Sequence, residues 1–315
     1  MFRNINDLWI DAIEHLLYHS HESTSRVGNI KEDLAFTATL SNIDQTFLLN
    51  KRRKLSPAYG SAELLWYLMP TKSIEMIVAY APQYIKFTDN DNRIAFGAYG
   101  YRIAKNTCLN QLNLIIEHLK AMPDSRQAII TMWNADDLYA SVYDKHNDIP
   151  CTISLQFFIR FNSLSMITTM RSNDAWLGLP YDIFTFTCIQ RLVANALNIP
   201  TGTYTHQVGS MHLYEKHWKA AEESLNIDRY YKAECNRIEH NWTPQDRRGN
   251  WTKDIIKAIE AEEAIRIKNQ FNVVMPECEM LKDLVRCCRK KLLSGCVQPS
   301  PSSPMLQEAI RVKQI

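Results

Sequence analysis

Residues 151–171 read CTISLQFFIRFNSLSMITTMR, and this stretch decides the fold. Its first ten residues, 151–160, mix apolar–polar alternation with a short apolar run, which is typical of a partly buried strand. Residues 163–171 are rich in apolar and β-branched side chains and form a second strand candidate. Because only Phe161 and Asn162 separate the two segments, the stretch predicts a β-hairpin.

The segments around this hairpin alternate between helical and extended patterns. Residues 183–197 are largely apolar and indicate a buried helix, and residues 201–209 form a further strand candidate. Other expected elements are a strand at 127–133 and helices at 5–19, 61–69, 108–121 and 211–224. Strands and helices in this order predict an α+β fold with a mixed sheet packed with helices.

The chain changes character near residue 230. Its 315 residues are enough for one large domain with a smaller appendage. Residues 254–268 and 279–293 are charged, amphipathic helix candidates, whereas residues 298–304 read QPSPSSP, which is typical of a flexible or polyproline linker. We therefore predict a main domain over residues 1–230 and a mostly helical C-terminal appendage over residues 231–315.

The composition narrows the class of protein. The 36 basic and 34 acidic residues give a net charge of +2, which argues against a dedicated nucleic-acid binder. No apolar run reaches the roughly 18 residues that a transmembrane helix needs, and acidic residues interrupt the N-terminal segment where a signal peptide would be apolar. The eight cysteines contain no C-x-x-C pair. We expect a cytoplasmic protein with no metal site, no direct nucleic-acid binding and no membrane partner.

Several polar residues stand where side chains with catalytic or binding roles are often found. Cys151 begins a strand, and Glu63 lies within the apolar helix expected at 61–69. A buried carboxylic acid is costly unless it is paired or used. Arg26, Arg126 and Arg171 lie near loops, and the planar guanidinium suits bidentate binding of phosphate. No P-loop and no G-x-G-x-x-G motif is present, so neither a nucleoside triphosphatase nor a Rossmann dehydrogenase is supported.

Each of these residues also has an ordinary structural explanation. A single cysteine is more often structural than catalytic, and most surface arginines are simply solvated. Glu63 could be partly exposed. His212 and Tyr214 fit a polar pair on the helix expected over 211–224. The residues alone therefore leave the chemistry open.

Six segments, in chain order between residues 20 and 220, resemble motifs of the thymidylate synthase superfamily. They are SRVGN (25–29), AELLWYL (62–68), PDSRQAIITMWN (123–134), IPCTISLQF (149–157), RSNDAWLGLPYD (171–182) and HQVGSMHLYEKH (206–217). RSND and VGSMHLY are most similar to the (deoxy)cytidylate 5-hydroxymethyltransferases of phage and CMP type within that superfamily. The resemblance implies a thymidylate synthase-like α+β fold, a homodimer with shared active sites, and 5,10-methylenetetrahydrofolate as co-substrate.

The resemblance also implies a role for each matching residue. Cys151 would attack C6 of the pyrimidine, and Glu63 would move protons through ordered water. The other implied roles are phosphate binding by Arg26, Arg126 of the partner subunit, Arg171 and Ser172; sugar binding by His212 and Tyr214; base recognition by Asp182; and folate contact or site lining by Asp174, Ile103, Gln156 and Asn173. The basic run KRRK, at 51–54, would lie near the glutamate tail of the folate.

Three positions depart from the thymidylate synthase pattern. Asp182 replaces the asparagine that reads uracil, and a carboxylate accepts a hydrogen bond from the amino group of cytosine. Ile103 replaces a tryptophan that shields the reaction intermediate, which would leave room for water. Thr152 replaces the histidine that follows the nucleophile. These departures favour a cytidylate 5-hydroxymethyltransferase acting on dCMP or CMP. Such an enzyme would be either a phage protein in the host cytoplasm or an enzyme of nucleoside biosynthesis.

Two other functions stay open at this point. One is a uridylate-using enzyme, either a thymidylate synthase or a deoxyuridylate hydroxymethylase, against which Asp182 and Ile103 argue. The other is a non-catalytic nucleotide-binding regulator that acts through its C-terminal appendage. The joint presence of Cys151, Glu63 and Arg171 argues against that regulator. The choice between ribose and deoxyribose is open as well.

Overall fold

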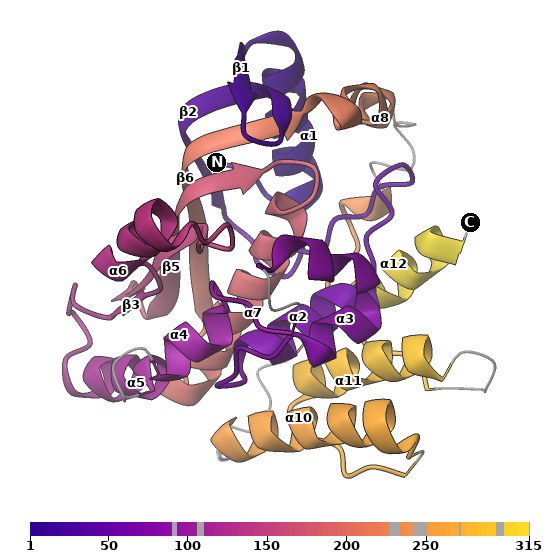
Figure 1. Ribbon diagram of the computed structural model, residues 1–315. Helices are drawn as coiled ribbons and strands as arrows, with labels where there is room; N and C mark the ends of the chain where they lie inside the picture. The colour runs from indigo at the N-terminus through magenta and orange to yellow at the C-terminus, as the bar shows by residue number, and fades with distance from the viewer. Residues whose placement is uncertain are drawn as a thin grey trace.

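A computed structural model describes residues 1–89, 93–105, 110–226, 234–240, 242, 251–270, 272–293 and 299–314. Its centre is a six-stranded sheet with the strand order β1-β2-β6-β5-β4-β3 (Figure 1). The strands are β1 (His21–Ser25), β2 (Gly28–Leu40), β3 (Ile129–Thr131), β4 (Thr152–Arg160), β5 (Ser163–Asp174) and β6 (Thr201–Tyr214). All neighbours are antiparallel except β5 and β6, which are parallel, so the predicted mixed α+β sheet is confirmed.

The hairpin predicted over 151–171 is present as β4 and β5. Phe161 and Asn162 form its tight turn with φ of 50° and 56°, the left-handed values that a two-residue turn of this kind requires. β5 then leads through α7 (Leu179–Leu197) into the parallel strand β6. This strand–helix–strand crossover explains why one short stretch controls the topology, because a parallel neighbour needs a long connection.

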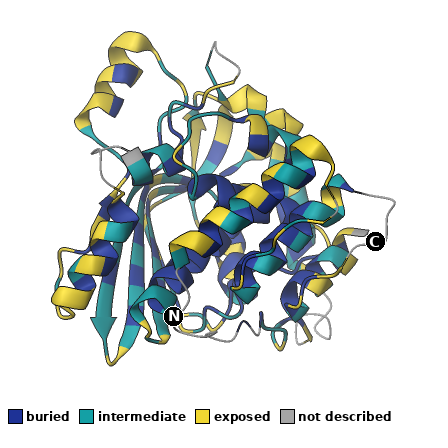
Figure 2. Cartoon of the chain, turned by 90° about the horizontal axis from the view of Figure 1, so that it is seen from below, coloured by how far each residue is buried: buried dark blue, intermediate teal, exposed yellow. Residues whose placement is uncertain are grey.

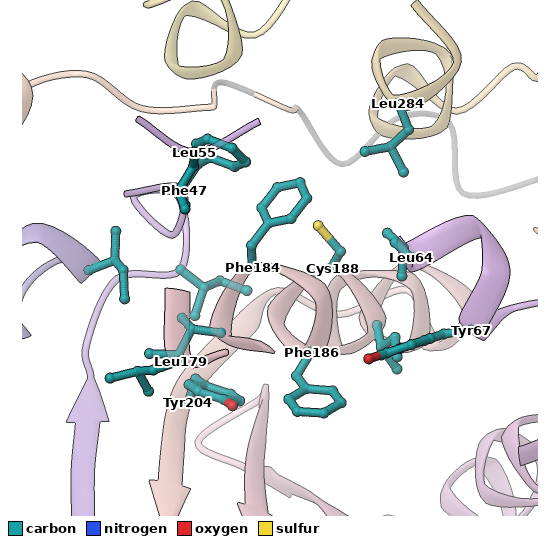
Figure 3. Packing of buried hydrophobic residues seen from close by; sticks show 14 of the residues in the cluster. Phe47, Leu55, Leu64, Tyr67, Leu179, Phe184, Phe186, Cys188, Tyr204 and Leu284 are labelled. Carbon is teal, nitrogen blue, oxygen red and sulfur yellow. The ribbon is translucent and has the colours of Figure 1, made fainter. Parts of the chain in front are cut away.

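Helix α7 is buried around its circumference. In Figure 3, Phe184 and Cys188 point to the side where Leu55 and Leu284 lie, while Phe186 points the opposite way. The helix therefore packs between the sheet and an outer helical layer. Its apolar composition has a direct physical cause, since a helix covered on both sides has no solvent face.

The remaining helices surround this centre, and many have one buried and one exposed side (Figure 2). They are α1 (Ile5–Tyr18), α2 (Pro57–Tyr67), α3 (Glu75–Tyr80), α4 (Tyr99–Lys105), α5 (Gln111–Ala121), α6 (Ala135–Tyr139), α8 (Glu215–Leu225), α10 (Trp251–Lys268), α11 (Glu279–Leu292) and α12 (Pro304–Gln314), with shorter helical segments η1 (Pro82–Phe87) and η2 (Ala140–Asp144). The start of the helix predicted at 108–121 lies outside the described residues.

Two predictions about local structure were wrong. Residues 211–214 are the end of strand β6 rather than the start of a helix, because all four pair with β2, and Met211 and His212 also pair with β5. The polar pair His212 and Tyr214 therefore lies on a strand. Strands β1 and β2 were not predicted, because residues 21–36 are largely polar, are mostly exposed or half-buried and show little hydrophobic alternation.

The C-terminal helices pack against the rest of the chain. α10 and α11 lie side by side, and α11 and α12 contact α2 (Figure 1). Their apolar residues belong to the same buried cluster as those of α1 and α7. The boundary at residue 230 remains a prediction.

The described part of the predicted Pro/Ser linker, residues 299–304, makes specific contacts with α11. Both carboxylate oxygens of buried Asp283 accept hydrogen bonds from Ser302 and Ser303, at 2.6–2.9 Å. Ser303 is buried, and α12 begins at Pro304. Asp283 therefore fixes this segment on α11. Residue 298 lies outside the described residues.

Candidate active site

The hairpin brings Cys151 and Arg171 together. The backbone N–H of Arg171 donates to the Cys151 carbonyl at 2.8 Å. The Arg171 guanidinium donates to the carbonyls of Pro150 and Ile149, both at 3.0 Å, and lies 3.7 Å from Cys151 Sγ. Two backbone carbonyls thus hold a cation beside the thiol.

The environment of Cys151 sets the charge of its thiol. Burial raises the pKa of the thiol, while the positive charge of Arg171 lowers it and the carboxyl of Asp182 raises it. Without substrate the sulfur therefore rests mainly as a thiol. Arg171 is the group that favours the thiolate, the form that attacks carbon.

Glu63 lies on α2 and is buried, with only 7% of its surface exposed. The Tyr59 hydroxyl donates to Oε1 at 2.7 Å, and the Thr185 hydroxyl lies 3.5 Å from Oε2. Burial, together with the nearby Asp182, raises the pKa of Glu63 from 4.5 to about 8. A carboxyl group with a pKa near neutrality can both give and take a proton, which suits general acid–base catalysis.

The raised pKa of Glu63 predicts a pH dependence of stability. The folded chain holds a proton that the unfolded chain releases between pH 4.5 and about 8, so the free energy of unfolding falls as pH rises through this window. Glu63→Gln removes this dependence, and we expect the loss of stability between pH 5 and pH 9 to be smaller by roughly 3 to 5 kcal/mol than in the unsubstituted chain. Urea denaturation at both pH values measures the difference.

The exposed Glu117 on α5 offers the control for this experiment. Glu117→Gln should leave the pH dependence of stability unchanged. If Glu63→Gln and Glu117→Gln behave alike, the assignment of a buried, protonated Glu63 is wrong.

Asp182 lies in the first turn of α7, and Asn173 near the end of β5 faces it. The Asn173 amide donates to Asp182 Oδ2 at 2.7 Å. Burial raises the pKa of Asp182 from 3.8 to about 7, and the bond from Asn173 opposes this rise. Asn173, predicted to line the site, is therefore a direct partner of the predicted base-reading residue.

Two further residues, His206 and Tyr204, extend the hydrogen-bonded pair of Asn173 and Asp182, and neither was predicted to have a role. His206 Nε2 lies 3.0 Å from Asn173 Oδ1, and the Tyr204 hydroxyl lies 2.7 Å from His206 Nδ1. Both residues are fully buried. A signal was present in the sequence: they occupy alternate positions of the strand predicted at 201–209, on the face that also carries Val208, so polar groups stand there among apolar ones.

The predicted phosphate and sugar residues gather where β5, β6 and the β1–β2 turn meet. Ser172 Oγ lies 3.5 Å from His212 Nδ1, and the rings of His212 and Tyr214 make an edge contact at 5.0 Å. Arg26 is exposed at the β1–β2 turn. Burial raises the pKa of Tyr214 and the charge of Arg26 opposes this rise, so Arg26 and Tyr214 are close enough to interact.

Asp174 and Arg53 form a polar and aromatic group at the start of α7. Asp174 Oδ1 accepts from the backbone N–H groups of Trp176 and Leu177, at 2.8 and 3.0 Å. Arg53, from the KRRK run, donates to the Trp176 carbonyl at 2.6 Å, and its guanidinium lies 5.7 Å from the Trp176 ring and 5.5 Å from that of Tyr181. These contacts hold the guanidinium of Arg53 against the start of α7, where it also interacts with the charge of Asp174.

Three predicted residues form no hydrogen bond with the Cys151 thiol in the described part of this chain. Arg126 is exposed, and its carbonyl accepts from the Gln156 amide at 2.9 Å. Gln156 follows Cys151 by five residues on an extended strand, a separation of roughly 17 Å. Ile103 is buried one helical turn after Tyr99, whose hydroxyl accepts from the Thr152 N–H at 3.0 Å.

A cavity of about 740 Å³ lies elsewhere in the described chain and is lined in part by Lys72, Lys86, Asp89, Phe96 and His146. The rings of Phe96 and His146 stack at 4.4 Å, and His146 Nδ1 lies 2.6 Å from the Asp89 carboxylate. The residues predicted for the active site are not in its lining. The candidate catalytic residues lie around Cys151 and not in this cavity.

The described residues lack two features that would indicate other functions. They contain no group of three or more His, Cys, Asp or Glu side chains placed to hold a metal ion. No helix within the described ranges is long and apolar enough to cross a membrane.

Comparison with protein families gives a match over most of the chain. The family model described as thymidylate synthase matches residues 7–265. The match includes the hairpin, α7 and every residue placed above in the site. It also extends beyond residue 230 into α10.

Proposed function

Because the chain belongs to the thymidylate synthase family, whose enzymes transfer a one-carbon unit from methylenetetrahydrofolate to a pyrimidine nucleotide, we propose that it is a cytidylate 5-hydroxymethyltransferase. Its product would be 5-hydroxymethyl-dCMP or 5-hydroxymethyl-CMP. The observation that carries this proposal is the buried carboxyl group of Asp182, held by Asn173 at 2.7 Å.

Cytosine and uracil differ in the hydrogen-bonding groups on the edge that carries C4 and N3. Cytosine presents an amino donor at C4 and an acceptor at N3, whereas uracil presents an acceptor at C4 and a donor at N3. A carboxylate oxygen accepts from the amino group of cytosine and repels the oxygen of uracil. With a pKa raised to about 7, Asp182 can also share a proton with N3 near neutral pH. Asp182 therefore suits cytosine better than uracil.

The other residues suit the chemistry of addition at C5. The Cys151 thiolate would form a bond to C6, Arg171 would stabilise the negative charge of the sulfur before attack, and C5 would become nucleophilic. The folate supplies the one-carbon unit. Glu63, protonated near neutral pH, would give and take protons during the transfer. With isoleucine at position 103 in place of a tryptophan, water would complete the reaction at the new carbon in place of a hydride.

A product assay tests this proposal. The purified protein is incubated with methylenetetrahydrofolate and, separately, with dCMP, CMP, dUMP and UMP, and mass spectrometry identifies the product. We expect a hydroxymethyl group on a cytidine nucleotide, and the preferred sugar follows from the same data. A methyl group on dUMP with dihydrofolate formed would contradict the role given to Asp182. The absence of product with all four would favour a binding protein.

We also propose a homodimer with shared active sites. α1 and α7 pack against one face of the sheet. The opposite face presents half-buried or exposed side chains that include Ile129, Phe158 and Ile167. The Gln156 amide, which binds the Arg126 loop, lies on a position that pairs with Ile129 and Ile167. Two copies packed through this face would each bring Arg126 towards the partner's phosphate site.

Mixing two inactive variants tests the shared site. Arg126→Glu and Cys151→Ser should each be nearly inactive alone. When subunits of the two variants exchange at random in an equal mixture, about half of the dimers contain one subunit of each. Each mixed dimer has one intact site of two, so the mixture should recover about a quarter of the activity of the unsubstituted protein. Turnover of the mixture after subunit exchange is the measurement. No recovery, with mixed dimers shown by mass spectrometry, would mean that Arg126 does not act across the dimer.

A further inference from the structure

Four buried polar side chains form one continuous line from β6 to α7. The line runs from the Tyr204 hydroxyl to His206 Nδ1 at 2.7 Å, from His206 Nε2 to Asn173 Oδ1 at 3.0 Å, and from Asn173 Nδ2 to Asp182 Oδ2 at 2.7 Å. All four residues are at most 9% exposed. Of these four residues, only Asp182 has so far been assigned a role in recognising the base.

We propose that Tyr204, His206 and Asn173 are positioning residues that hold Asp182 as a hydrogen-bond acceptor towards the group at C4 of the base, and so select an amino group over an oxo group. This inference rests on the proposed function. It goes further, because it assigns base selection to three residues that would not touch the substrate.

The direction of each hydrogen bond follows from the donor and acceptor inventory. Burial lowers the pKa of His206 to about 3, so its ring is neutral and carries one N–H. Because the Asn173 amide donates to Asp182, its carbonyl oxygen faces His206 and must accept from Nε2–H. Nδ1 then carries no hydrogen and accepts from the Tyr204 hydroxyl. Asn173 is thereby fixed with its amide N–H groups towards Asp182.

The direction of the hydrogen bond between Asn173 and Asp182 influences whether Asp182 is ionised or protonated. An N–H donated to Oδ2 stabilises the carboxylate, and the bond from Asn173 indeed opposes the rise in the pKa of Asp182 that burial causes. If Asn173 turned over, its carbonyl oxygen would face Asp182 and would stabilise the protonated acid instead. A protonated Asp182 offers an O–H group, which suits the C4 oxygen of uracil. The line of hydrogen bonds therefore separates a cytosine-reading state from a uracil-reading state.

The backbone leaves room for this pair at Gly178. A Cβ atom at position 178 would lie 2.8 Å from Asn173 Nδ2, closer than real Cβ contacts, and 3.0 Å from Asp182 Oδ2, tighter than most of them. The glycine at the start of α7 thus permits the contact between Asn173 and Asp182.

The test measures binding of dCMP and of dUMP to the protein without folate, by titration calorimetry. His206→Phe keeps a ring of similar size but no donor, and we expect the ratio of dCMP to dUMP affinity to fall about tenfold or more. Tyr204→Phe removes only the hydroxyl, and about a threefold fall is expected. His206→Gln restores an N–H at nearly the same distance and should keep the ratio within about twofold.

Tyr80→Phe is the matched control. It removes another buried tyrosine hydroxyl, which donates to Glu262 at 2.8 Å, and it should leave the ratio unchanged. Thermal denaturation checks that every variant is folded, and Tyr204→Phe still tests the proposal if His206→Phe does not fold. The proposal is overturned if folded His206→Phe or Tyr204→Phe keeps the ratio, if His206→Gln loses as much as His206→Phe, or if Tyr80→Phe loses as much as Tyr204→Phe.

Failure of this inference can be told apart from failure of the proposed function. If the unsubstituted protein binds dUMP better than dCMP, cytidylate specificity itself is wrong. If it prefers dCMP and the His206 variants do so equally, only the positioning role is wrong.

Discussion

Cys151→Ser is expected to lower turnover at least about a thousandfold while leaving nucleotide affinity within about threefold of its original value. A serine hydroxyl is far less acidic than a thiol, and the Arg171 guanidinium 3.7 Å from the sulfur cannot ionise it at neutral pH. The positions of Arg26, Ser172 and His212 do not depend on the sulfur atom. The loss should therefore appear in kcat rather than in binding, as measured by steady-state kinetics and by titration with the nucleotide.

Cys278→Ser is the matched control for this substitution. Cys278 is also a free, partly exposed cysteine, and it stands before α11 on the C-terminal side of the chain. It should keep full activity. Comparable losses in the two variants would point to a general effect of removing a thiol and would contradict Cys151 as the nucleophile.

Asp182→Asn is expected to reverse the base preference. An asparagine whose carbonyl oxygen accepts the bond from Asn173 turns its amide N–H groups to the base, where they suit the C4 oxygen of uracil and oppose the amino group of cytosine. Leaving a buried donor or acceptor unmatched costs a few kcal/mol, so the ratio of kcat/KM for dCMP to that for dUMP should fall by about a thousandfold. Steady-state kinetics with both nucleotides gives this ratio.

Asp254→Asn serves as the control for the change at position 182. Asp254 is as buried as Asp182, at 8% against 9% exposed, and it accepts hydrogen bonds from the backbone N–H groups of Glu277 and Cys278. Its substitution should reduce stability without altering the ratio. A preference for dCMP that survives Asp182→Asn would show that another group reads the base.

The parts of the fold that the sequence predicted are those with a strong local pattern. The hairpin at 151–171 and the buried helix at 183–197 have clear periodicity, a short turn and an apolar composition. The end of β6 was predicted as a helix, because no local pattern marks residues 211–214 as extended. They form a strand through pairing with β2 and, in part, with β5. β1 and β2 were missed because their side chains are largely polar.

In the candidate site, too, some features follow from local sequence motifs and others only from the tertiary structure. The sequence by itself determined that Cys151 and Arg171 lie on one hairpin and that Asp182 follows it near the start of a buried helix, since these residues lie within motifs that are local in the chain. Their roles as nucleophile, phosphate ligand and base-reading residue are predictions from the resemblance of those motifs. Only the tertiary structure decided that Glu63 is buried near Asp182, that His206 and Tyr204 fix Asn173, and that the C-terminal helices pack on α2. These relations join residues far apart in sequence, and they depend on burial and hydrogen-bond direction, which no local pattern of residues encodes.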